Sequence, residues 1–266
     1  MGTLVVFHAH PDDEAISTAG TVARAVDAGH RAVLVLATRG EHGEIVPGTL
    51  AAGEQLGVRR VAETFAAAAA LGIDRVEFLG YVDSGMMGTP PNDEPYSFWT
   101  ADVDAAARRL ACILSEEAAD VLTIYDDHGG YGHPDHIQVH RVGARAAELA
   151  GVAAVYEATM NRDHIRRARA RAVAEGREVT GPEDPEVELV IGTPEHELTH
   201  AVDVRAVIDR KRAAMVAHRS QIADDSWFLA LDDDAFAVVF GTEWFRRHGA
   251  PPGAGPESVD LLPGLA

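Results

Sequence analysis

Apolar runs without polar alternation recur along the first half of the chain. Four of them, rich in Val, Ile and Leu, cover residues 4–8, 31–37, 75–80 and 121–125. Strands that are apolar on both sides belong to sheets that are covered on both faces, as parallel sheets are. The runs therefore predict four buried strands of a parallel sheet.

Longer segments with helical spacing separate these runs. The Ala-rich stretches at about 14–28, 54–72 and 100–118 place apolar residues three and four positions apart. Strands that alternate with helices indicate βαβ units with right-handed crossovers. We therefore expect an α/β fold with a mostly parallel sheet flanked by helices.

The pattern loosens after about residue 150. A basic helical stretch at 161–173 precedes the acidic segment 181–186, and we interpret it as a solvated helix face beside an acidic loop rather than an anion site. An amphipathic helix is predicted at about 203–219.

Two aromatic pairs, Trp227–Phe228 and Trp244–Phe245, are expected to pack as cover near the end of the chain. The chain is thus predicted to be a single domain over 1–266. Its core would lie in 1–150, with an extension and cover in 151–266.

Charge and composition narrow the class of protein. Forty-two acidic and 23 basic side chains give a formal charge of -19, which repels nucleic acid and anionic membranes and favours a neutral or cationic small substrate. The acid excess is equally open to interpretation as a solubility feature.

No apolar run is long enough to span a bilayer. The single cysteine, Cys112, is predicted to be a core residue in a reducing compartment, which indicates a cytoplasmic protein. A homo-oligomer remains possible.

Two histidine-carboxylate runs follow predicted strands. His10-Pro11-Asp12-Asp13-Glu14 comes just after the first strand, and Tyr131-Gly132-His133-Pro134-Asp135-His136 follows the strand that ends near Tyr125. Ligands of such sheets bind at the carboxyl ends of the strands. Both runs are therefore expected at one edge.

Three of these residues are predicted to bind a divalent metal ion. His10 and Asp13 converge from one turn, and His136 arrives from the first turn of a helix that begins at Pro134. Three ligands leave a position for water, as in catalytic zinc sites. Zinc is preferred, although Fe(II), Mn(II) and Co(II) also accept such ligands. The alternative is that the aspartate pair only caps a helix.

The other members of the two runs have predicted catalytic roles. Asp12 is the candidate general base, and His133 is expected to face the developing oxyanion or the leaving amine, as a cation if it controls the high-pH limb of the rate profile. Asp135 is the candidate partner that holds the tautomer of His133. Tyr131, between glycines, is predicted to swing in as a further donor.

The remaining histidines are interpreted as structural. His8 lies two residues before His10 and is assigned a structural role. The others are expected to be surface or satisfied interior residues: His30, His42, His140, His164, His196, His200 and His248.

The motifs resemble those of the LmbE-like or PIG-L family of metal-dependent N-acetylglucosaminide deacetylases. The family pattern AHPDDE stands here at Ala9–Glu14, and HPDH stands at His133–His136. The similarity continues through further short motifs: Arg60-x-x-Glu63, Leu71-Gly72, Phe78-Leu79-Gly80, Asp83-Ser84-Gly85 and Ala217-His218-Arg219-Ser220-Gln221.

The resemblance implies a Rossmann-like sheet, zinc at His10, Asp13 and His136, and a base at Asp12 assisted by His133. It also implies that Arg60 and Asp83 hold sugar hydroxyls. For these two residues, a helix-surface arginine and a turn aspartate remain the alternatives.

The family chemistry is hydrolysis of an N-acetyl amide on a glucosaminide, which releases acetate and a free amine. Two actinobacterial branches act in mycothiol chemistry, one on the GlcNAc-inositol precursor and one as an S-conjugate amidase. Ser17 stands where the amidase branch tends to carry lysine, which favours the deacetylase. A non-catalytic metal- or sugar-binding protein is the alternative of another class. The aglycone would be selected by loops such as 41–52 and 84–98.

Overall fold

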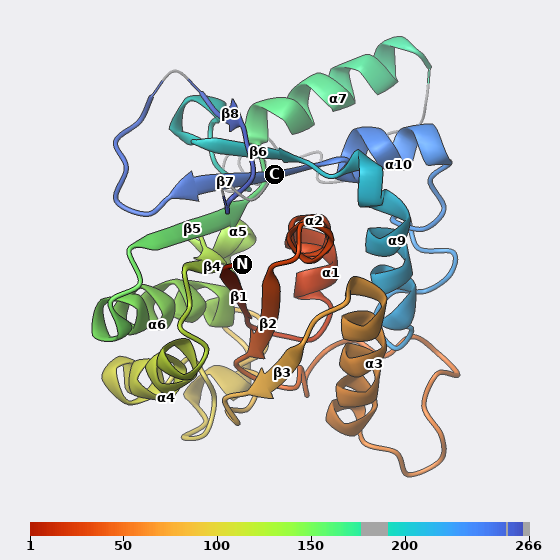
Figure 1. Ribbon diagram of the computed structural model, residues 1–266. Helices are drawn as coiled ribbons and strands as arrows, with labels where there is room; N and C mark the ends of the chain where they lie inside the picture. The colour runs from red at the N-terminus through yellow and green to blue at the C-terminus, as the bar shows by residue number, and fades with distance from the viewer. Residues whose placement is uncertain (177–190, 254, 263–266) are drawn as a thin grey trace.

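The computed structural model describes residues 1–176, 191–253 and 255–262, and within them eight strands form one sheet. The strand order is β3-β2-β1-β4-β5-β7-β6-β8, with the first five strands parallel (Figure 1). Strand β7 runs antiparallel to both of its neighbours, and β8 runs parallel to β6. The strands are β1 Thr3–His8, β2 Arg31–Leu36, β3 Arg75–Phe78, β4 Val121–Tyr125, β5 Ala154–Thr159, β6 His200–Asp203, β7 Thr242–Arg247 and β8 Glu257–Ser258.

Helices cover both faces of the sheet, and β1 shows why. Its alternate residues enter two separate cores: Val5 and Phe7 pack with residues of α4 and α6, whereas Leu4 and Val6 pack with residues of α2, α3 and α9. The helices are α1 Asp13–Ser17, α2 Ala19–Asp27, α3 Leu56–Leu71, α4 Val103–Glu116, α5 Gly129–Gly132, α6 Pro134–Ala150, α7 Arg162–Ala174, α9 Ile208–Ala217 and α10 Asp233–Phe240. Single 3₁₀ turns are η1 Pro90–Asp93, η2 Glu195–Glu197 and η3 Arg205–Val207.

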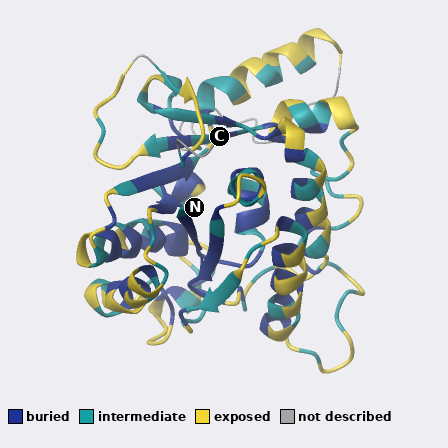
Figure 2. Ribbon diagram, in the orientation of Figure 1, coloured by how far each residue is buried: buried dark blue, intermediate teal, exposed yellow. Residues whose placement is uncertain are grey.

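The predicted α/β fold is confirmed. All four predicted strands and the helices at 54–72 and 100–118 are present within a few residues of the expected bounds. The helix predicted at 14–28 is two helices, α1 and α2, because Thr18 leaves helical geometry with φ -137°. Figure 2 shows the central strands buried and the outer sides of the helices exposed.

The segment after residue 150 contributes more than the predicted cover. It adds β5, β6, β7 and β8 to the same sheet, and these strands are absent from the sequence prediction. Trp244 and Phe245 lie in β7, with Phe245 fully buried in the core. Trp227 does stack on Phe228, with ring centroids 4.1 Å apart, and Phe228 packs against the core.

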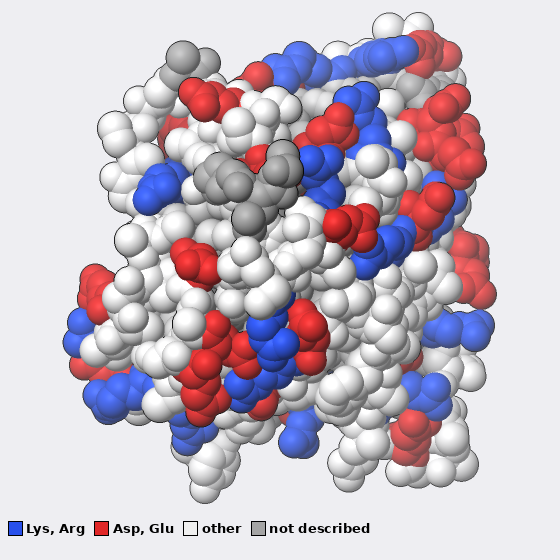
Figure 3. Space-filling view, in the orientation of Figure 1, with Lys and Arg blue, Asp and Glu red and all other residues white. Residues whose placement is uncertain are grey.

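Helix α7 has no buried residue, and its arginines pair with acidic side chains, as Arg167 does with Glu195 and Arg171 with Glu175. Both signs of charge are mixed on the face shown in Figure 3. The solvated-face interpretation is therefore confirmed, while the acidic segment 181–186 lies outside the described residues. No helix in the described ranges is both long and apolar enough to cross a membrane.

The prediction that Cys112 is a core residue is wrong. Its side chain is exposed on α4, whereas Ala107, Leu110, Ala111 and Leu114 form the buried side of that helix. Cys112 is one position beyond Ala111, which turns it about 100° away from the buried stripe. Its exposure removes the packing argument for a reducing compartment.

The strand order places the two motifs together. Strands β1 and β4 are parallel neighbours, and from this pair the sheet continues through β2 on one side and β5 on the other. Side chains that follow the carboxyl ends of two such strands meet at the switch point, where ligands bind in open α/β sheets. His10 follows β1 and His136 follows β4 at this point.

Candidate metal and catalytic site

The turn after β1 brings His10 and Asp13 together. The His10 N–H donates to Asp13 Oδ2 over 2.8 Å, and the His10 Nδ1 lies 3.4 Å from the same oxygen. Asp12 between them has φ 102°, a left-handed conformation that is rare for a residue with a Cβ. This turn directs two neighbouring carboxylates to different surroundings.

Helix α6 supplies the second half of the site. It begins at Pro134, as predicted, with His133 as its N-cap. The ring centroids of His133 and His136 lie 5.1 Å apart, and those of His10 and His136 lie 5.4 Å apart. Nitrogens of all three histidines lie within 4.8 Å of one another, so the structure brings the two motifs into one cluster.

The donor atoms fit a divalent cation. Asp13 Oδ1 lies 3.4 Å from His136 Nε2, and this buried nitrogen has no hydrogen-bond partner. Although burial opposes it, the carboxylates of Asp13, Asp135 and Asp83 raise the pKa of His10 well above its usual range. An unsatisfied buried nitrogen in surroundings that favour positive charge suits a metal ion.

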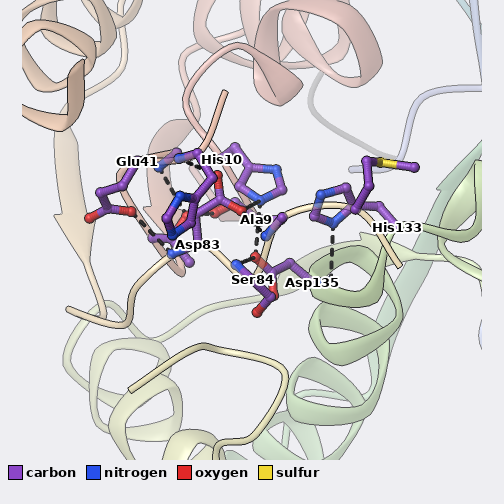
Figure 4. A network of polar contacts seen from close by, with 12 residues as sticks. Ala9, His10, Glu41, Asp83, Ser84, His133 and Asp135 are labelled. Atoms are coloured by element: carbon purple, nitrogen blue, oxygen red, sulfur yellow. Dashed lines mark hydrogen bonds and ion pairs between the residues drawn. The ribbon is translucent and has the colours of Figure 1, made fainter. Parts of the chain in front are cut away.

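Asp135 is the partner of His133 through its backbone N–H, whereas its carboxylate faces His10 and Ser84. Its Oδ2 lies 3.1 Å from His10 Nε2 and accepts from the Ser84 N–H over 2.9 Å, while Oδ1 accepts from the Ser84 hydroxyl (Figure 4). A carboxylate behind a histidine orients the ring for metal binding through its other nitrogen. Asp135 therefore supports His10.

His133 is oriented by the backbone of Asp135. The Asp135 N–H donates to His133 Nδ1 over 3.1 Å, so the neutral ring carries its proton on Nε2. Burial, together with His10 and His136, lowers the pKa of His133 to about 4. These surroundings disfavour the cationic form considered from the sequence and leave a neutral Nε2–H donor.

The partly buried Asp12 pairs with the buried Arg60 beside this cluster. Burial raises the pKa of Asp12 to about 6, against the opposing effect of Arg60. Arg60 Nη2 lies 3.2 Å from Asp12 Oδ1 and also donates to the Pro11 carbonyl, and Nη1 donates to the Gly40 carbonyl over 2.9 Å. Arg60 is thus a buried residue with several contacts inside the protein, and the alternative of a helix-surface arginine is wrong.

Asp83 is also engaged within the protein. Its Oδ1 accepts from the Gly85 N–H over 2.8 Å, and its Oδ2 accepts from the His42 N–H over 3.1 Å. Oδ1 lies 3.5 Å from His10 Nε2. Figure 4 draws Asp83 and His10 from close by. Arg60 and Asp83 thus hold loops beside the site.

Tyr131 lies at the mouth of the site, 44% exposed. Its ring centroid lies 5.0 Å from that of His136. Both flanking glycines, Gly130 at φ 71° and Gly132 at φ 91°, have left-handed backbones that permit the tight turn. Burial raises the pKa of the Tyr131 hydroxyl, which therefore remains a hydrogen-bond donor at neutral pH.

Sequence reasoning gave no role to two buried residues next to Asp12. Glu14 Oε2 accepts from the Asp12 N–H over 3.1 Å, and Glu14 Oε1 lies 2.6 Å from His218 Nε2. Glu14 and His218 both stand in motifs of the resemblance, which is the signal that could have identified them. Their mutual contact has no signal in the spacing, since 204 positions separate them.

The structural assignment of His8 agrees with its contacts, since its ring nitrogens pair with Tyr125 Oη and Thr18 Oγ1 in the core. His140 and His248 meet around the buried Glu157, a grouping that the sequence did not predict. Arg246 Nε already pairs with Glu157 Oε2 at 2.5 Å, and His248 Nδ1 with Oε1 at 2.7 Å. This second cluster is a satisfied polar network.

Comparison with known proteins identifies relatives of the whole chain. The family model described as PIG-L, GlcNAc-PI de-N-acetylase, matches residues 5–147. The chain is 43% identical, over 99% of its length and 95% of the relative, to a 1D-myo-inositol 2-acetamido-2-deoxy-alpha-D-glucopyranoside deacetylase of Acidothermus cellulolyticus. It is 42% identical, over 98% and 97% of the two chains, to a protein of the same name from Geodermatophilus obscurus.

The fold also matches that of a solved deacetylase. The N,N'-diacetylchitobiose deacetylase from Pyrococcus horikoshii superposes with a TM-score of 0.59 over 92% of this chain and 82% of the other, at 23% identity. That likeness concerns the fold. The sequence matches span most of the chain and include both motifs of the site, and they show that this protein belongs to the PIG-L family of de-N-acetylases.

Proposed function

We propose that the chain is a zinc-dependent N-deacetylase that hydrolyses the acetamide of a GlcNAc-inositol-like glucosaminide to acetate and a free amine. The observation that carries this proposal is that Asp12 and His133 adjoin the three proposed ligands: Asp12 precedes Asp13 in one turn, and the His133 ring centroid lies 4.6 Å from that of His10. The name of the relative that is 43% identical supports the choice of sugar.

His10, Asp13 and His136 would hold the metal ion. When bound, the ion supplies Lewis-acid activation of the amide carbonyl and of water. Asp135 keeps the His10 ring oriented through Nε2. Zinc is favoured by the two imidazoles and one carboxylate, and Fe(II) is the alternative ion.

Asp12 moves the proton in this mechanism. Its carboxylate takes a proton from the attacking water as the C–O bond forms, and a base whose pKa lies near 6 is matched to neutral pH. The resulting carboxylic acid returns the proton to the sugar nitrogen as the C–N bond breaks. This gives acetic acid and the amine, and transfer of the remaining acid proton to the amine leaves acetate and the ammonium form of the sugar, so atoms and charge balance.

His133 stabilises the charge that develops on the acetyl oxygen. Its Nε2–H is a neutral donor, because Nδ1 is occupied by the Asp135 N–H. Such donors act most strongly on the transition state. The Tyr131 hydroxyl would add a second donor from the mouth of the site.

Substrate recognition is proposed for the loops that surround this centre. Arg60 and Asp83 would contact sugar hydroxyls in addition to their loop contacts. Around them, the loops 41–52 and 84–98 carry exposed apolar side chains that would contact the aglycone: Ile45, Met86, Met87 and Tyr96.

The rival activities are disfavoured by particular residues. An S-conjugate amidase is less favoured because Ser17 replaces the lysine typical of that branch. A protein that only binds a metal or sugar is less favoured because Asp12 and His133 are both in place.

The test is acetate release by the purified protein from a panel of N-acetyl sugars, with metal content measured on the same sample. We expect one divalent ion per chain, release from GlcNAc-inositol above that from free GlcNAc, and loss of activity with a chelator. Turnover of a thiol conjugate alone would favour the amidase. Binding without any turnover would overturn the proposal.

A further inference from the structure

We propose that His218, acting through Glu14, is a positioning residue for the general base Asp12. The inference rests on the proposed function, in which Asp12 takes the proton from water. It begins with the backbone of Asp12, whose φ of 102° is unfavourable for a residue with a Cβ. Such a conformation persists only where neighbouring groups hold it.

Glu14 is one of the groups that hold it. The Asp12 N–H donates to Glu14 Oε2 over 3.1 Å from two positions away. Because this bond fixes the amide on one side of Asp12, it fixes the direction in which the Asp12 side chain leaves the turn. Arg60 holds the carbonyl of the same Pro11–Asp12 peptide bond and also pairs with the Asp12 carboxylate.

Glu14 is in turn held by His218. The Glu14 side chain is fully buried, so its second oxygen needs a partner. His218 Nε2 lies 2.6 Å from that oxygen, and His218 is also fully buried. Of the described groups, none is within hydrogen-bond reach of His218 Nδ1. The contact through Nε2 is therefore what the His218 side chain contributes to this network.

The C-terminal half of the chain fixes the position of His218. The residue follows α9, where Lys211 Nζ donates to the Ile16 carbonyl over 2.7 Å. After it, the Ser220 N–H and hydroxyl donate to Glu63 over 3.0 and 2.6 Å. The base in the N-terminal turn is thus aligned by a residue more than 200 positions away in the sequence.

This arrangement predicts a specific kinetic effect. Glu14 lies between His218 and the turn that carries the candidate metal ligands, and the loop 41–52 is bonded instead to Ser220, whose carbonyl accepts from the Val46 N–H over 2.9 Å. Losing its contact should misplace Asp12 while metal and substrate still bind. Small misplacements of a catalytic group cost up to about 100-fold in rate.

The experiment compares two substitutions of similar polarity. In His218→Gln, the amide nitrogen reaches about as far as Nε2 and can still donate to Glu14. In His218→Asn, it reaches only about as far as Nδ1. We expect His218→Gln to keep kcat within about threefold of wild type and His218→Asn to lower kcat about 10- to 100-fold. Metal content and KM for GlcNAc-inositol should stay unchanged in both.

Asp12→Asn, assayed in parallel, separates the two proposals. If Asp12→Asn is inactive but His218→Asn and His218→Gln are equally active, the positioning role alone is wrong. It is also wrong if the loss in His218→Asn appears only in KM or as lost metal. A fully active Asp12→Asn overturns the base assignment and the positioning role with it.

A second pair of variants serves if the His218 variants do not fold. Glu14→Gln keeps an acceptor for the Asp12 N–H, and it must retain more kcat than Glu14→Met.

Discussion

Adjacent aspartates in one turn have opposite electrostatic surroundings. Burial raises the pKa of Asp12 to about 6, whereas His136 and His10 hold the pKa of Asp13 well below its usual range although burial opposes them. A carboxylate that stays charged suits a metal ligand, and one that titrates near neutral pH suits a base. The left-handed turn at Asp12 separates the two environments.

We therefore expect different phenotypes from the two truncations. Asp12→Ala should keep its metal and lower kcat by roughly 100-fold or more, since it removes a general base. Asp13→Ala should instead lose most of the metal. Metal analysis and kinetics on both purified variants check this. If the phenotypes are exchanged, the two roles must be exchanged as well.

The protonation state of His133 gives a second prediction. Burial, with His10 and His136, lowers the pKa of His133 to about 4, so the ring is neutral at any higher pH. His133→Ala should lower kcat by about 10²- to 10³-fold, and this factor should be constant from about pH 6 to 9.

A pH series of kcat on wild type and His133→Ala is the measurement. If His133 acted as a cation, the wild type would lose its advantage as the pH rose through the pKa of the ring. The ratio of the two rates would then fall towards high pH. Such a fall would contradict the neutral-donor mechanism.

At the scale of elements, α6 is seated closely on β4. Gly143 faces Ile124 and Phe7, and a Cβ at this glycine would lie 2.3 Å from Ile124 Cγ2 and 3.4 Å from Phe7 Cδ1. The same helix carries His136 at its first turn. The close approach of helix and strand therefore sets the depth at which this ligand enters the site.

Gly143→Ala should lower the stability of the protein in spite of alanine's better helix propensity. The propensity gain is about 1 kcal/mol, whereas overpacking a buried contact costs about 1–3 kcal/mol. We expect a net loss of up to about 2 kcal/mol by denaturant unfolding and a reduced metal affinity. Gly253→Ala is the control, because no atom lies within 4 Å of its added Cβ. Equal stabilities of the two variants would refute the close packing of α6 on β4 as the cause.

At the scale of the whole molecule, a buried ion pair joins the C-terminal strands to the N-terminal half. Glu243 on β7 accepts from Lys211 on α9 and from the Gly20 and Thr21 N–H groups at the start of α2, over 2.8 and 2.7 Å. The side chains of Glu243 and Lys211 are 2% and 1% exposed. One carboxylate thus connects a strand and two helices.

Glu243→Gln should cost about 3–5 kcal/mol of unfolding free energy, because it leaves the Lys211 charge buried without its counter-ion. The control is Asp260→Asn, which breaks the exposed bidentate pair with Arg24, two contacts of 2.8 Å, and should cost less than about 1 kcal/mol. Equilibrium denaturation of both variants provides the comparison. A loss at Glu243 no larger than that at Asp260 would disprove the stabilising role of the buried pair.

The sequence alone determined the features that depend on local pattern and on the geometry of parallel strands. Uninterrupted apolar runs predicted the strands from β1 to β4. Because carboxyl ends of parallel strands share an edge, the same pattern predicted that His10 and His136 would meet there. The helix start at Pro134 followed from local backbone preference.

Other features were decided by the tertiary structure. Strands β5 to β8 escaped prediction because their short segments mix polar and apolar residues, and their place depends on partners that pair from far along the chain. The outward direction of Cys112 required knowing which helix face α4 buries. The contacts of the residues that orient the site were likewise decided by the tertiary structure. The Asp135 carboxylate faces His10, and Glu14 meets His218, because side-chain direction and long-range approach are set by packing and not by spacing.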